Sequence, residues 1–315
     1  MKAGTWFTLA CSLAGIGMVI AADVTPGQPP APPPPPHFFA PKSPVPLTMD
    51  GVLNEDIWQK ATPVRVDYVD KGGGVPTEPP KMISKVVWDD HYLYIGYEVF
   101  DTNVTAAGQG DLQGPKGRQR ESVVIDSTGK ADFTEFFISF GDANFFWEIH
   151  HNAANNFSDV WCTVVDPKWP LAKSSMHRYG IMFGAIDIIE DEGPYTLATA
   201  VNFRFAPKGN RSTLNNPADV DQGYTAEIRL PWAGIGAPRD LETFIPVDPN
   251  NKGFTIPGPW KMTGQTASLL SVCHNGDINQ NYFHSAPQRQ GGWFHTSYPL
   301  WPVYEFVDTM PEPKP

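Results

Sequence analysis

Residues 85–101, KVVWDDHYLYIGYEVFD, constrain the fold of this chain most. The segment up to Trp88 leads into Asp89-Asp90, and the run from Tyr92 to Phe100 is almost entirely apolar and aromatic. Aromatic and β-branched residues favour strands, whereas paired aspartates favour a reversal of the chain. The stretch therefore predicts a β-hairpin whose second strand is central in a sheet. The tryptophans beside chain reversals are expected to fill the core: Trp58, Trp88 and Trp232.

Short apolar runs of this kind recur between turn signals along the 315 residues, which include 33 Pro and 28 Gly. Only residues 55–59 suggest a helical turn, and long loops are expected over 102–130 and 205–222. This pattern predicts an all-β fold, a single β-sandwich of roughly ten antiparallel strands. The expected strands cover residues 65–69, 83–88, 92–100, 133–140, 145–150, 159–164, 179–188, 195–201, 223–230, 260–268 and 303–307.

The N-terminal region predicts export. Lys2 precedes an apolar run over residues 6–20 and a small-residue cleavage site near Ala22, as in a signal peptide over 1–22. The apolar run is too short and glycine-rich for a membrane span. The domain boundaries follow from composition: a proline-rich linker in polyproline II conformation over 23–46, the sandwich over 47–308 and a disordered tail over 309–315. We therefore expect a secreted, periplasmic or cell-surface protein.

Charge, cysteine content and motifs narrow the function. The formal net charge is -11, and no Lys/Arg cluster occurs, which disfavours nucleic acid and anionic membranes as partners. No nucleophile elbow, phosphate loop or Cys/His nucleophile pattern is present, so no enzyme activity is expected. After cleavage two cysteines remain, Cys162 and Cys273, which form either one disulfide or two buried thiols.

Six segments of the chain, taken in order, resemble carbohydrate-binding module family 9 and, more broadly, its DOMON-like β-sandwich relatives. The resemblance covers nearly the whole domain and implies a non-catalytic sandwich that binds sugars. It also implies structural calcium and a place beside glycoside hydrolases that act on xylan or cellulose. The segments are MDGVLNEDIWQKA (49–61), the hairpin at 85–101, DFTEFFIS (132–139), FWEIHHNAANNFSD (146–159), GYTAEIRLPWAGIG (223–236) and WFHTSYPLWPVYEF (293–306).

Sugar binding requires an aromatic surface against the ring and polar groups that satisfy its hydroxyls. The resemblance implies two aromatic side chains that clamp the terminal sugar between them. The first, a tryptophan expected in DSTGKA (126–131) before DFTEFFIS, has no counterpart in this chain, and the position of the second corresponds to His295. Half of the aromatic clamp is therefore missing and half is altered. The residues that the resemblance assigns to the ligand are Glu135, Glu148, His150, Gln265, Trp293 and His295.

Calcium is the cofactor implied by the resemblance. Four aspartates near loop ends are candidate ligands, because carboxylates and loop carbonyls are the usual calcium donors. The alternative is ordinary turn chemistry, in which each aspartate caps its own backbone. These residues are Asp101, Asp126, Asp132 and Asp159.

Two other functions remain open from the sequence. A DOMON-like module that holds a b-type haem would use a methionine with a histidine or a lysine as axial ligands. The available residues are Met176, Met182, Met262, His150 and His177. Alternatively, the sandwich has lost its ligand and acts as a structural or interaction module.

Overall fold

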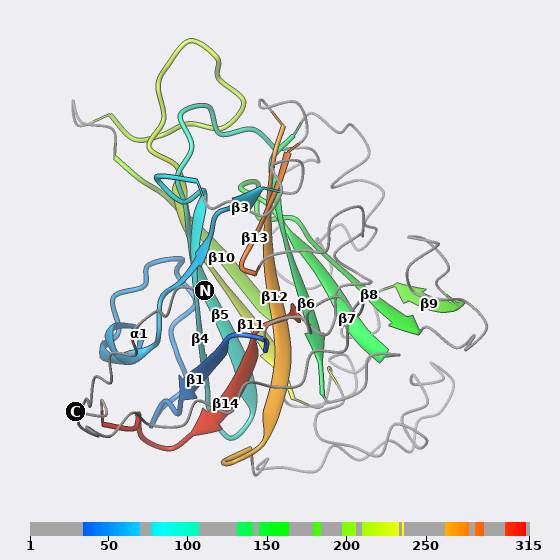
Figure 1. Cartoon of the computed structure of the whole chain (residues 1–315). Helices are drawn as coiled ribbons and strands as arrows, with labels where there is room; N and C mark the ends of the chain where they lie inside the picture. Colours follow the sequence, from blue (N-terminus) through cyan, green and yellow to red (C-terminus); the bar gives the residue numbers. More distant parts are fainter. Residues whose placement is uncertain are drawn as a thin grey trace, which may run out of the picture. The chain divides into compact units, whose positions relative to one another are not determined.

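The structure is a computed structural model that describes residues 34–69, 77–106, 131–140, 145–163, 179–183, 197–205, 210–232, 235, 262–276, 281–286 and 300–312. Residues 145, 158–163, 179–183 and 281 are described by their backbone alone. The helix in these ranges is α1, Asp56–Lys60. No helix of the described residues has the length and hydropathy required to cross a lipid bilayer. The rest of the regular secondary structure consists of strands in two sheets, which confirms the predicted β-sandwich (Figure 1).

The larger sheet has nine described strands in the order β1-β14-β12-β6-β7-β8-β9, with β13 paired to β12 and β3 paired to β13. The pairing of β1 with β14 is parallel, and the remaining pairings are antiparallel. The strands are β1 His37–Pro41, β3 Tyr68–Val69, β6 Phe133–Ser139, β7 Phe145–His151, β8 Phe157–Thr163, β9 Tyr179–Phe183, β12 Thr266–Asn275, β13 Asn281–His284 and β14 Val303–Val307.

The smaller sheet has five described strands in the order β10-β11-β5-β4-β2, all antiparallel. Its centre is the predicted hairpin. Asp89 closes the turn, because its Oδ1 accepts the backbone N–H groups of His91 and Tyr92 at 2.7 and 2.8 Å. The strands are β2 Val64–Val66, β4 Met82–Trp88, β5 Tyr92–Val99, β10 Ala198–Phe203 and β11 Tyr224–Pro231.

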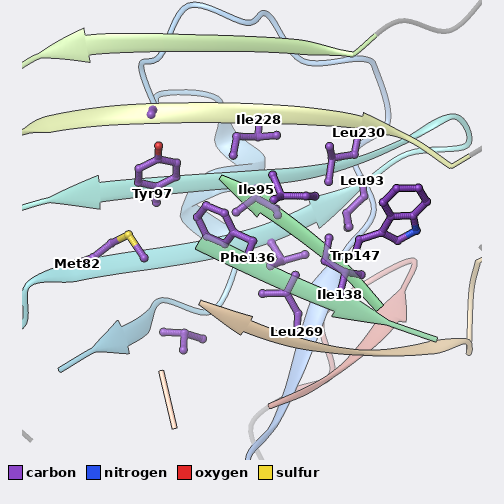
Figure 2. Close-up of a cluster of buried hydrophobic side chains, with 14 of the residues drawn as sticks. Met82, Leu93, Ile95, Tyr97, Phe136, Ile138, Trp147, Ile228, Leu230 and Leu269 are labelled. Carbon is purple, nitrogen blue, oxygen red and sulfur yellow. The ribbon is translucent and has the colours of Figure 1, made fainter. Parts of the chain in front are cut away.

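The main hydrophobic core lies between the inner faces of the two sheets, as Figure 2 shows. Leu93 and Ile95 of β5 face Phe136 and Ile138 of β6 across this core. The three tryptophans predicted to fill the core are fully buried, and each indole N–H has an acceptor. These acceptors are Glu227 Oε1 for Trp58, the Ala40 carbonyl for Trp88 and the Asp89 carbonyl for Trp232.

The predicted proline-rich linker over residues 23–46 is wrong at its C-terminal end, where strand β1 forms. Strand β1 pairs with β14 from His37 to Pro41, and Phe38 packs against Tyr304 at 5.5 Å between ring centroids. Residues 37–40 retain their N–H groups, and β1 is an edge strand, where a terminal proline is tolerated. The sheet therefore begins about ten residues earlier than the composition predicts.

Strand β12 also differs from its prediction over residues 260–268. It begins at Thr266, after a turn in which Gly264 has a φ of +79°, and continues to Asn275. The polar residues Cys273 to Asn275 resemble a turn in the sequence, but they pair with β6 and β13. Strand β13 was not predicted, because four residues carry too short a pattern.

Cys273 is a free thiol, buried in the main core. Burial raises its pKa well above the usual value. The disulfide with Cys162 is therefore not formed, and the alternative of a buried thiol holds for Cys273. The side chain of Cys162 lies outside the described residues.

Candidate ligand-binding site

The outer face of the larger sheet carries a group of polar side chains. On β6, Phe136 and Ile138 point into the main core, so Glu135 and Phe137 point to the opposite face. In the antiparallel register, Glu135 lies opposite His150 of β7, and Phe137 lies opposite Glu148. The alternation of β6 and β7 therefore brings together three of the predicted residues, which we call the Glu–Glu–His cluster: Glu135, Glu148 and His150.

The cluster is compact and buried. His150 Nε2 lies 3.0 Å from Glu148 Oε1 and 3.4 Å from Glu135 Oε1. Glu135 and Glu148 are each 3% exposed and His150 is 1% exposed. His150 Nε2 and Glu148 Oε1 share one hydrogen bond, whose direction depends on the tautomer of the imidazole. Buried carboxylates are stable only when hydrogen-bonded or paired with positive charge, so this position favours a proton, a cation or a hydroxyl-rich ligand.

Aromatic rings flank the cluster on one side. Phe133 stacks on His150, with 5.7 Å between centroids and 26° between planes, and on His274 at 4.6 Å and 28°. Tyr282 of β13 lies 4.7 Å from His274 and is partly exposed. His274 and Tyr282 were not predicted, because the predicted strand ended at residue 268. A strand that extends to Asn275 places His274 on the same face as Leu270 and Val272.

Gln265 does not join the cluster. It lies exposed in the turn before β12, whereas the residue of β12 opposite Glu135 is Val272. Seven residues of extended strand separate the two positions, which is about 23 Å. Trp293 and His295 lie outside the described residues. Of the six predicted ligand residues, the described structure therefore unites Glu135, Glu148 and His150.

His150 and His151 point to opposite faces of β7, as adjacent strand residues must. His151 points inward, where its Nδ1 lies 2.5 Å from the Tyr97 hydroxyl and its Nε2 lies 2.8 Å from Asn155 Oδ1. The two histidines are thus unable to bind one ion.

Two of the predicted calcium ligands, Asp101 and Asp132, use their oxygens as hydrogen-bond acceptors. Asp132 Oδ1 accepts the N–H of Gly276, and its Oδ2 accepts both the N–H and the hydroxyl of Thr105, each at 2.8 Å. Asp101 accepts one backbone N–H and one side-chain amide. The contact of Asp101 with the Asn103 N–H is the local capping that the sequence left as the alternative, whereas the partners of Asp132 lie far from it in the chain.

The pKa of Asp132 reflects its burial beside a second carboxylate. Burial, together with the charge of nearby Asp101, raises the pKa of Asp132 to about 7. A calcium ligand is an ionised carboxylate with lone pairs directed at the ion. The calcium site at Asp101 and Asp132 stays a prediction. The side chains of Asp126 and Asp159 lie outside the described residues.

The two described candidates for haem ligation, Met262 and His150, are not brought together. Met262 is fully buried in the main core, whereas His150 points from the outer face of the larger sheet. These two side chains therefore lie on opposite sides of the sheet and do not form an axial pair. Met176, His177 and the side chain of Met182 lie outside the described residues.

The fold and this site define the class of protein: a β-sandwich with polar and aromatic groups gathered on the outer face of one sheet. Within that class, the sequence model of the family described as carbohydrate family 9 binding domain-like matches residues 49–116. The matched region includes α1 and the hairpin of β4 and β5, and it confirms the resemblance drawn from the sequence. No curated protein matches the chain.

Solved structures share the fold at low identity. One is a proposed carbohydrate-binding protein from Bacteroides uniformis, 11% identical, with a TM-score of 0.50 over 86% of this chain and 99% of that one. Another is a family 9 module from Caldicellulosiruptor kristjanssonii in complex with cellotriose, 13% identical, with a TM-score of 0.44 over 87% and 95% of the two chains. The first likeness supports the sandwich fold alone.

Proposed function

We propose that this protein is an exported, non-catalytic carbohydrate-binding protein that binds a plant-type polysaccharide, such as xylan or cellulose, or its chain ends. The observation that carries the proposal is the Glu–Glu–His cluster, which lies beside stacked aromatic rings on the outer face of the larger sheet. The match of residues 49–116 to a carbohydrate-binding family supports the same class of ligand.

The chemistry of the cluster suits sugar hydroxyls. The carboxylates of Glu135 and Glu148 accept hydrogen bonds, and the imidazole of His150 donates or accepts according to its tautomer. Tyr282 supplies a partly exposed ring against the C–H surface of a sugar. Because the cluster itself is nearly fully buried, we expect it to contact one terminal sugar residue rather than the flat side of a long chain.

Binding without turnover is part of the proposal. The matched family is one of binding domains, and the sequence holds no known catalytic motif. Export rests on the signal peptide predicted over residues 1–22. A role in polysaccharide breakdown would require glycoside hydrolases that act on the same substrate, and the protein would hold that substrate near them.

The experiment is a glycan array with neutral and acidic plant oligosaccharides, followed by isothermal titration calorimetry with each hit. We expect wild type to bind at least one oligosaccharide, and E135Q and Y282A each to weaken binding at least tenfold, a loss of about 1.4 kcal/mol. The control is F205A, since Phe205 is an aromatic residue 71% exposed that follows β10 of the smaller sheet.

Loss of binding in F205A but not in E135Q would move the site to the other sheet. A wild-type protein that binds no glycan would overturn the proposal and favour the structural or interaction module.

A further inference from the structure

We propose that the Glu–Glu–His cluster is a binding site for a divalent transition-metal ion such as Zn²⁺. Glu135, Glu148 and His150 each offer one ligand atom, and these atoms all lie within 4.8 Å of one another. Metal binding at this position stands on the geometry of the cluster. Any contact between the metal and a sugar rests in addition on the proposed function.

The distances in the cluster approach those of a tetrahedral site. Zn–N and Zn–O bonds of roughly 2.0–2.1 Å at tetrahedral angles place two ligand atoms about 3.3 Å apart. His150 Nε2 lies 3.0 Å from Glu148 Oε1 and 3.4 Å from Glu135 Oε1. Two of the three ligand separations thus need changes of only a few tenths of an ångström. The third separation, between the two carboxylates, closes by rotation of flexible glutamate side chains.

The ligand set selects the kind of ion. One imidazole nitrogen and two carboxylate oxygens suit Zn²⁺ and related transition ions, whereas Ca²⁺ and Mg²⁺ prefer oxygen ligands alone. A divalent ion offsets the charge of two ionised carboxylates. Metal ligands are deprotonated, so the ion takes the place of any proton held between the ligand atoms.

The surroundings hold the ligands in place. Glu135 and His150 are directly paired positions of adjacent strands, so the sheet fixes their backbone separation. Phe133 stacks on the His150 ring and limits its rotation. Phe137, next to Glu135 on the same face, belongs to a second buried apolar cluster with Phe146 and Trp301. A rigid, apolar setting of this kind lowers the cost of organising a metal site.

Three protein ligands leave one position of a tetrahedral ion for an outside group. A water molecule or a sugar hydroxyl oxygen can occupy that position. The metal would then make sugar binding dependent on the ion, which deepens the proposed function of the same site.

The test is calorimetric titration of Zn²⁺ into the EDTA-treated and desalted protein, with Ca²⁺ and Mg²⁺ titrated in parallel. We expect wild type to bind one Zn²⁺, and E148Q and H150A each to bind it with an affinity at least about tenfold lower. Repeating the titration in buffers of different ionisation enthalpy measures any proton that binding releases. H37A is the control, because His37 is a 46% exposed histidine paired with Glu305.

Circular dichroism and cooperative urea unfolding establish that each variant is folded. If H150A fails to fold, E148Q carries the test alone, since glutamine preserves the side-chain volume. Zn²⁺ binding of equal strength in wild type, E148Q and H150A would overturn the proposal. A wild-type protein that shows no heat of Zn²⁺ binding would overturn it too. Equal affinity for Ca²⁺ and Zn²⁺ would also contradict it.

Glycan titrations in EDTA and in Zn²⁺ separate this proposal from the proposed function. A Zn²⁺ site that is lost in E148Q, without any glycan binding, supports the metal site and refutes carbohydrate binding. Glycan binding that is equal in EDTA and in Zn²⁺, together with no Zn²⁺ heat, supports carbohydrate binding and refutes the metal site.

Discussion

The burial of Glu227, in the middle of β11, leads us to expect that the stability of the protein depends on pH. The substitution E227Q removes the contribution of this one group. It is 1% exposed, and its Oε2 accepts the N–H groups of Asp50 and Gly51 at 3.1 and 2.9 Å, while Oε1 accepts the indole N–H of Trp58 at 3.1 Å. Burial raises the pKa of Glu227 from 4.5 to about 7, with a smaller contribution from the charge of Glu55, although the three donors lower it.

The sign and size of the change in the free energy of unfolding with pH follow from proton linkage. The folded protein keeps the Glu227 proton up to about pH 7, whereas the unfolded chain releases it near pH 4.5. The contribution to stability is therefore complete below pH 4.5 and is lost as the pH rises towards 7. The slope is about −1.4 kcal/mol per pH unit, so the free energy of unfolding should fall by about 2 kcal/mol between pH 5.5 and 7 from this group alone.

The assay is urea unfolding of wild type and E227Q between pH 5.5 and 8, followed by tryptophan fluorescence. Glutamine does not titrate, so the free energy of unfolding of wild type minus that of E227Q should fall by about 2 kcal/mol over this range. Asp132 and His284, whose pKa values are raised to about 7 and lowered to about 3, titrate equally in both proteins and cancel in the difference.

E312Q is the control, because Glu312 is an exposed residue that follows β14. The pH dependence of its free energy of unfolding should follow that of wild type. A wild type minus E227Q difference that is flat, or that increases with pH, would refute the linkage argument.

Two further predictions concern the backbone and the core. Gly223 has a φ of +89°, and a Cβ there would lie 1.8 Å from the Val99 carbonyl oxygen, so G223A should cost more than about 3 kcal/mol in urea unfolding or prevent folding. G264A, at a φ of +79° with no atom within 4 Å, should cost only about 1–2 kcal/mol, and equal losses in the two variants would contradict the steric argument. Native wild type and native C273S should expose the same number of reactive thiols to a thiol reagent, because Cys273 is 3% exposed, and the two should differ by one thiol only in urea.

The local parts of the fold were predictable from the sequence. The hairpin of β4 and β5 carries its own turn chemistry at Asp89, and its strands are seven and eight residues of mostly apolar or aromatic sequence. The period of two in the strands DFTEFFIS and FWEIHH assigns Glu135, Glu148 and His150 to one face. The cluster could therefore be predicted, because it depends only on period-2 patterning and on the pairing of two consecutive strands.

The parts that depend on distant partners were not predictable. Strand β1 pairs with β14, which lies at the other end of the chain, so nothing near His37 indicates a strand. Gln265 was placed in the site because β12 was predicted too early, and the position of a strand along its neighbour depends on long-range register. For the same reason His274 and Tyr282 were missed.

Histidine NMR of the imidazole nitrogens tests the central claim most directly, namely that a carbohydrate binds at the Glu–Glu–His cluster. The His150 resonances are assigned from the spectrum of H150A, and those of His37 from the spectrum of H37A. Titration with an oligosaccharide that the array identifies should shift the Nε2 resonance of His150 and leave His37 unchanged. Saturable glycan binding with no change at His150 would contradict the account.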